Sequence, residues 1–191
     1  SKIQLSKMNG IDLNDCLMAA EIIQKYEKDN ETSFASDVYN YYMENLENFS
    51  ARDLAFSSIY FANLRDVKVD DLVKITLIVS SKYGELTQSH KFEFYTSLLK
   101  WAKRHHNLID SLKSNSSQLG SFAIPSSSLV DEYNNFVDKY DDSNDKVEAQ
   151  RMVENFFDAH AVEMGFNPQY AKQLFSKVEI GFEDMSGYNL K

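Results

Sequence analysis

The sequence predicts an all-α protein, and two observations carry that prediction. Only 6 Gly and 2 Pro occur among 191 residues, well below the usual share, so most connections must be short and strand-rich folds built on Gly turns are disfavoured. Apolar side chains also recur every three to four residues from residue 13 onward, which is the spacing of a helix with one buried face. We expect eight or nine helices, stacked as hairpins in a solenoid-like fold with a period of about 38 residues.

The first expected helix pair lies within residues 13–50. Its first helix has a buried stripe, and Asn30 and Glu31 interrupt the pattern before Thr32 or Ser33 caps the second helix. The stripe residues of the first helix are Leu13, Cys16, Leu17 and Ala20, and those of the second are Phe34, Val38, Tyr41, Tyr42 and Leu46.

The second expected pair lies within residues 51–88. Ser50 followed by Asp53 is a variant of the capping box, which favours a helix start there. Asp70 or Asp71 is expected to cap the next helix, and Gly84 to end it in a left-handed conformation.

The segments 13–50, 51–88 and 89–126 align without gaps, which predicts three repeated hairpins. The alternative is a single irregular helical bundle, because amphipathic helices of similar length can resemble one another by chance. Four columns of the alignment are apolar: Cys16, Leu54 and Phe92; Met18, Phe56 and Phe94; Ile23, Phe61 and Leu99; and Tyr26, Leu64 and Ala102.

We therefore expect an N-terminal extension over 1–12, repeats over 13–126, a helical region over 127–180 and an irregular tail over 181–191. The helical region could hold a fourth hairpin, with an acidic turn and N-cap over 141–145, and a last helix with Asn167 as cap and Pro168 in its first position. Residues 111–128 contain eight Ser, so the helix there should be short and end before Gly120, which marks a possible subdomain boundary.

Charge and cysteine content exclude several classes of protein. The net charge of −9 opposes binding to nucleic acid, and no apolar run approaches the roughly 20 residues of a membrane span, which predicts a soluble protein. Cys16 is the single cysteine, so neither an intrachain disulfide nor a Cys-rich zinc site can form, and a reducing compartment fits best. Ser1 in place of Met fits initiator removal or cleavage of a targeting peptide equally.

No pattern typical of catalysis, cofactor binding or metal binding occurs, so we expect a protein that is not an enzyme and holds no cofactor. His105 and His106 are adjacent and point about 100° apart on a helix, which disfavours a shared zinc ion. An EF-hand loop needs acidic or amide ligands at positions 3 and 12. Counted from Asp138, these positions hold Tyr140 and Ala149, so the sequence does not predict an EF-hand calcium site here.

Aromatic residues are in excess, with 13 Phe, 11 Tyr and one Trp. They either fill the core or leave some rings for a protein partner, since aromatic side chains are enriched in interface cores. The candidate partner-binding residues are Tyr39, Tyr42, Phe94, Tyr95 and Trp101. The locally basic segment 89–106 offers an alternative site for an anion or RNA, with Lys91, Lys100, Lys103 and Arg104.

Residues 49–64 carry the pattern Phe-Ser-x-x-Asp-Leu-Ala followed by Phe-Ala-x-Leu. This stretch resembles the helix-pair repeats of the FAST-kinase-like and octotricopeptide families and, more distantly, pentatricopeptide repeats. The resemblance implies an α-solenoid and a mitochondrial or other organellar location. These families often place Trp where Ile59 stands, so no RNA-contacting position is carried over. Some members are protein-binding accessory subunits, such as a pentatricopeptide-like subunit of F1-ATPase.

The resulting hypothesis is a non-catalytic scaffold that binds other proteins, as an accessory or assembly subunit of a mitochondrial or other organellar complex of the respiratory or ATP synthase kind. Its acidic surface would select basic partners. The alternative is an organellar RNA-binding or RNA-processing factor that uses the basic helix 89–106.

Overall fold

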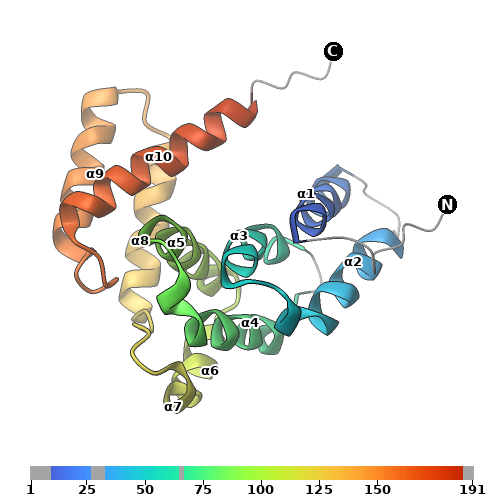
Figure 1. The fold of residues 1–191 in the computed structure, drawn as a ribbon. Coiled ribbons are helices and arrows are strands. Elements are labelled where there is room, and N and C mark those ends of the chain that lie inside the picture. The colour runs from blue at the N-terminus through green and yellow to red at the C-terminus, as the bar shows by residue number, and fades with distance from the viewer. Residues whose placement is uncertain (1–9, 27–32, 65–66, 187–191) are drawn as a thin grey trace. The chain divides into compact units, whose positions relative to one another are not determined.

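A computed structural model describes residues 10–26, 33–64 and 67–186 of the chain. The described residues form ten α-helices and two short 3-10 helices, with no strand among them, which confirms the all-α class (Figure 1). Ten is more than the eight or nine helices expected, because residues Ser116–Leu119 form a separate short helix. The chain divides into two compact units, and each is described by itself. Unit 1 comprises residues 1–97 and 105–122, and unit 2 comprises residues 98–104 and 123–191.

Unit 1 is built from helices α1 to α7, of which only the first part of α5 belongs to it. The bounds are α1 Gly10–Tyr26, α2 Ser33–Glu44, η2 Leu46–Asn48, α3 Ala51–Phe61, α4 Val69–Ser81, η3 Tyr83–Glu85, α5 Gln88–Arg104, α6 Leu108–Ser114 and α7 Ser116–Leu119.

Helices of unit 1 contact their neighbours in sequence and their second neighbours. α1 packs on α2 and α3 packs on α4, while α1 also contacts α3 and α4 contacts α6 (Figure 1). The guanidinium of Arg52 on α3 acts on the carboxyl of Glu93 on α5, so these two helices also lie close together. Each contact buries one apolar stripe against another, which is the main source of stability for amphipathic helices.

The core of unit 1 includes a cluster of aromatic rings between α2 and α3. The rings of Tyr42 and Phe61 lie 4.8 Å apart, and the Tyr42 hydroxyl is 2.6 Å from the Ser57 hydroxyl. Burial raises the pKa of Tyr42, since an ionised phenolate would lose its hydration there. The hydrogen bond to Ser57 satisfies a polar group that would otherwise be buried alone.

Helix starts in unit 1 confirm one predicted cap and correct two other expectations. The Ser50 hydroxyl accepts the Asp53 backbone N–H at 3.1 Å, so the predicted cap of α3 is present. Lys68, not an Asp, is the N-cap residue of α4, which places Asp70 and Asp71 inside its first turn. Gly84 lies in η3 and does not adopt positive φ, so it does not end α4 as expected.

A short helix that ends before Gly120 was predicted here. The structure has two short helices, α6 and α7, and α7 ends at Leu119, before Gly120. Gly120 has φ of 59°, a conformation that favours glycine and stops α7. Phe122 then folds back on the unit, with its ring 5.3 Å from that of Tyr83 and 6.2 Å from that of Phe94.

Unit 2 contains three helices together with the last turns of α5. Their bounds are α8 Ser127–Asp141, α9 Lys146–His160 and α10 Pro168–Ser186. α9 contacts both α8 and α10 (Figure 1). Asn134 on α8 donates to the Leu99 carbonyl at 3.1 Å, and the Lys103 ammonium lies 2.9 Å from the Asp131 carboxylate, so α8 is also tied to residues 98–104.

The interior of unit 2 contains a cluster of phenylalanine rings. The rings of Phe136 and Phe156 stack at 4.5 Å, and Phe175 of α10 lies 5.1 Å from Phe136. Asp145 caps α9 as predicted, and Asn167 caps α10, with Pro168 as its first residue. α10 continues to Ser186, so the irregular tail expected from residue 181 is corrected for residues 181–186. Residues 187–191 of that tail, the extension over 1–9 and the expected break at Asn30 and Glu31 lie outside the described residues.

Candidate functional site

Four of the five aromatic residues expected to bind a partner are buried. Their side chains are 0–2% exposed, so they belong to the core and do not serve as surface anchors; these residues are Tyr42, Phe94, Tyr95 and Trp101. The ring of Tyr42 lies next to that of Phe61, and the rings of Phe94 and Tyr95 lie next to that of Phe122. Periodicity within one helix could not reveal these contacts, because the partners are distant in sequence. Tyr39 is half-buried, stacks on Phe61 at 5.0 Å and donates its hydroxyl hydrogen to the Asp71 carboxylate.

The four basic residues of segment 89–106 do not fall in one unit. Lys91 belongs to unit 1, where its ammonium lies 5.1 Å from the centre of the Tyr83 ring. Lys100, Lys103 and Arg104 belong to unit 2. There Lys103 pairs with Asp131, and the ammonium of Lys100 opposes the rise in the pKa of Asp141 that burial causes. Acidic neighbours therefore offset the positive charge that RNA binding would need.

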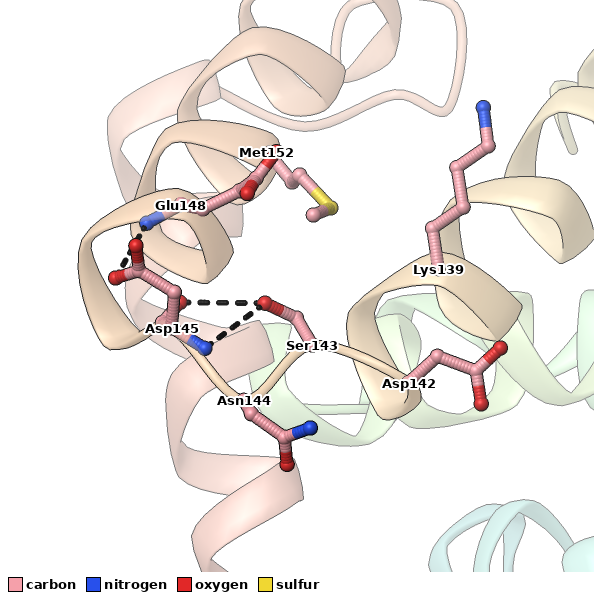
Figure 2. Close-up of a pocket in the computed structure, with 7 residues that line it drawn as sticks. All are labelled: Lys139, Asp142, Ser143, Asn144, Asp145, Glu148 and Met152. Atoms are coloured by element: carbon pink, nitrogen blue, oxygen red, sulfur yellow. Dashed lines mark hydrogen bonds between the residues drawn. The ribbon is translucent and has the colours of Figure 1, made fainter.

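A hollow of about 590 Å³ lies at the turn between α8 and α9 (Figure 2). Lys139 stands on one side of it and Met152 on the other, and the acidic turn forms its floor. The remaining lining residues are Asp142, Ser143, Asn144, Asp145 and Glu148.

Two of the acidic side chains at this hollow, those of Asp145 and Glu148, have structural partners. The Asp145 carboxylate accepts the backbone N–H groups of Val147 at 2.8 Å and Glu148 at 3.4 Å, and Glu148 lies 3.4 Å from the Arg151 guanidinium. This arrangement caps α9 and stabilises its first turn.

Histidine and cysteine side chains are not grouped. Within the described ranges, no three His, Cys, Asp or Glu side chains come together as metal ligands would. His160 lies 2.8 Å from the Glu132 carboxylate and ties α9 to α8, and His90 contacts the Thr87 hydroxyl at 3.0 Å. Cys16 is half-buried, whereas the sequence predicted a core position for it.

Exposed apolar side chains occur on α1 and on α3, two helices in contact. Ile22 on α1 is 49% exposed and Phe56 on α3 is 42% exposed, although both helices contribute other apolar residues to the core. The Phe56 ring lies 5.8 Å from that of Tyr60, in an edge-to-face arrangement. Water contact with a large apolar surface costs free energy that a bound partner would recover.

Two carboxylates of α1 act on the same region. Burial raises the pKa of Tyr60, and the negative charges of Glu21 and Asp15 raise it further. The Glu21 carboxylate also accepts the Asn63 side-chain amide at 2.8 Å, which fixes α1 against the end of α3. We call this set the α1/α3 surface: Asp15, Glu21, Ile22, Phe56 and Tyr60.

The sequence contains a pattern that indicates exposed aromatic residues on α3, but the repeat alignment did not use it. Leu54, Ala55 and Phe61 mark the buried stripe of α3, and Phe56 and Tyr60 lie four residues apart, outside that stripe. Phe56 was instead aligned with Met18 and Phe94 as an equivalent column. The structure separates them, since Phe94 is buried and Phe56 is exposed.

No family model, curated protein or solved structure matches this chain. None of the helices within residues 10–26, 33–64 and 67–186 combines the length and hydropathy that crossing a bilayer requires.

Proposed function

We propose that the chain is a non-catalytic scaffold of repeated helix pairs that binds other proteins, as an accessory or assembly subunit of an organellar complex. The observation that carries the proposal is the α1/α3 surface, where Ile22 and Phe56 are exposed on two helices in contact. Isolated exposed apolar residues are common, but neighbouring ones on adjacent helices favour a protein-binding surface.

The positions of the helices support the repeat part of the proposal. The starts of α1, α3, α5 and α8 at residues 10, 51, 88 and 127 differ by 41, 37 and 39 residues. Those of α2, α4, α6 and α9 at residues 33, 69, 108 and 146 differ by 36, 39 and 38. Both series agree with the period of about 38 residues expected from the sequence.

Packing within unit 1 supports it further. In an array of helix pairs, each first helix contacts the next first helix, and each second helix contacts the next second helix. The contacts of α1 with α3 and of α4 with α6 follow this rule, and so does the effect of Arg52 on Glu93 between α3 and α5.

A site-specific photo-crosslinking experiment tests protein binding. A photoreactive phenylalanine analogue replaces Phe56 in the full chain expressed in its native source, and crosslinked proteins are identified by mass spectrometry. The matched control carries the analogue at Val147 of unit 2, which is also apolar and is 79% exposed. We expect recurrent subunits of one assembly from position 56 and not from position 147.

Two outcomes would contradict the scaffold hypothesis. Crosslinks to RNA in place of protein, lost on changing Lys100, Lys103 and Arg104 together to Ala, would support the RNA-binding alternative. Equal yields from positions 56 and 147 would show that the α1/α3 surface has no specific partner. Fractionation of the same cells tests the organellar location, which a purely cytosolic signal would contradict.

A further inference from the structure

We propose that the α1/α3 surface binds an amphipathic helix of another protein, one whose apolar stripe is flanked by Lys or Arg. The proposal rests on the protein-binding function above and names the chemistry of the partner. It follows from the exposed apolar side chains, the carboxylates next to them and the all-helical surroundings of the surface.

The apolar part of the surface spans two helices. Ile22 projects from α1, and the Phe56 and Tyr60 rings from α3 touch each other edge to face. α1 and α3 lie side by side (Figure 1). Two adjacent helices present rows of side chains between which the ridge of a third helix packs, so exposed apolar side chains on both helices suit a helical partner.

The charge next to these anchors is negative. Glu21 and Asp15 both raise the pKa of Tyr60, which places their carboxylates close to the phenol. Two cations also stand on these helices: Arg52 acts on Glu93 of α5, and Lys25 lies in the last turn of α1. Around Tyr60 itself the acidic groups dominate, so a cationic partner is attracted there, both by the carboxylates and by the faces of the two rings.

In the proposed third repeat, the position aligned with Phe56 is covered. Phe94 is aligned with Phe56, and its side chain is fully buried, with the Phe122 ring 6.2 Å away. At Phe94 the chain itself supplies covering groups. At Phe56 the described residues leave 42% of the side chain exposed, which a partner would cover.

A helix can bind this surface without a sheet edge. One common way of binding an extended peptide is to add it as a strand to a sheet edge, and the described residues contain no strand. A helix satisfies its own backbone hydrogen bonds, so it needs only an apolar stripe and complementary charge.

Designed peptides test the partner chemistry with the full chain. The first probe is a fluorescent helical peptide of about 18 residues, long enough to form a helix, with a Leu stripe flanked by Lys. A second peptide replaces each Lys by Glu, and a third has the composition of the first in scrambled order. Binding is measured by fluorescence anisotropy at two salt concentrations. We expect saturable binding of the Lys peptide alone, weakened by salt.

Variants then locate the binding. Phe56→Ala should weaken binding of the Lys peptide by at least about fivefold, as for a residue at an interface centre. Asp15→Asn with Glu21→Gln should weaken it and reduce its salt dependence; this pair keeps an oxygen that can accept the Asn63 amide. Val147→Ala and Asp142→Asn in unit 2 are the matched controls, and circular dichroism checks that every variant keeps its helix content.

Three outcomes would overturn the partner chemistry: equal binding of the Lys and Glu peptides, binding of the scrambled peptide, or equal loss from the unit 2 controls. These results can be told apart from failure of the scaffold function. If position 56 crosslinks to protein subunits while the Lys peptide does not bind, the scaffold function is supported and the basic helix is wrong.

Discussion

The hydroxyl of Tyr42 shows how a single polar atom is accommodated in the core of unit 1. It lies 2.6 Å from the Ser57 hydroxyl, which itself donates to the Leu54 carbonyl at 3.3 Å. Tyr42 was expected to contact a partner, yet its ring and its hydroxyl both serve the interior. Sequence periodicity identified an apolar helix face here but could not tell which neighbour would cover it.

Tyr42→Phe should lower the free energy of unfolding by about 1 kcal/mol, because a buried hydrogen bond is lost while the ring is kept. Urea unfolding followed by circular dichroism measures the change. Tyr41→Phe is the control, since Tyr41 is only half-buried and should change stability by less than about 0.5 kcal/mol. Equal effects of the two changes would argue against the Tyr42 to Ser57 bond.

Glu93 gives a pH-dependent prediction at the same scale. Burial raises its pKa, and this outweighs the opposing effects of His90, Ser89 and Arg52. The folded state therefore disfavours the carboxylate, and this residue's contribution to stability decreases as pH rises from below its ordinary pKa through its raised pKa. Glu93→Gln should thus stabilise the protein more at about pH 7 than at about pH 4, relative to the unchanged chain.

Urea unfolding of both proteins at the two pH values checks this prediction. Glu154→Gln, at an exposed position of α9, is the control and should show no such pH-dependent gain. A Gln variant of Glu93 that is less stable at neutral pH than at acid pH, relative to the unchanged chain, would contradict the assigned cause.

At the level of helices, most starts were predictable and most burial partners were not. Ser50, Asp145 and Asn167 were recognised as caps, because a cap depends on residues within one turn. Asp70 and Asp71 were mistaken for caps, since α4 begins two residues earlier than an acidic cap would require. The exposure of Phe56 was missed because the repeat alignment placed this residue in an apolar column, although it lies outside the buried stripe of α3.

Two aspartates in one turn allow a sharp test of capping. Asp145→Ala should destabilise the protein by about 1 kcal/mol, because its carboxylate holds two backbone N–H groups at the start of α9. Asp142→Ala removes the same charge from the same turn and should cost less than about 0.5 kcal/mol. Thermal or urea unfolding compares them, and similar losses would show that charge, not capping, matters there.

Over the whole molecule, the division into units was only partly visible in the sequence. The serine-rich segment 111–128 suggested a boundary, and all residues from 123 onward belong to unit 2. The assignment of residues 98–104 to unit 2 had no sequence signal, because α5 reads as one continuous amphipathic helix.

A fragment of residues 123–191 should therefore be much less helical and less stable than a fragment of residues 98–191. The shorter fragment lacks the Leu99 carbonyl that accepts from Asn134 and the Lys103 ammonium that pairs with Asp131. It also lacks the buried side chains of Leu98, Leu99, Trp101 and Ala102. Circular dichroism and thermal melting compare the two. Equal melting temperatures would show that residues 98–104 are dispensable to unit 2.

The membership of α5 in both units limits how this chain could be recombined with others. A chimaera joined at the serine-rich connection would inherit the three C-terminal helices without the helical turns that they pack against. A graft that transfers the C-terminal unit intact must carry residues 98–104 as well, even though they precede the connection that starts at residue 111. Crossovers within α5 itself, at residue 97 or before, are the ones that keep this unit complete.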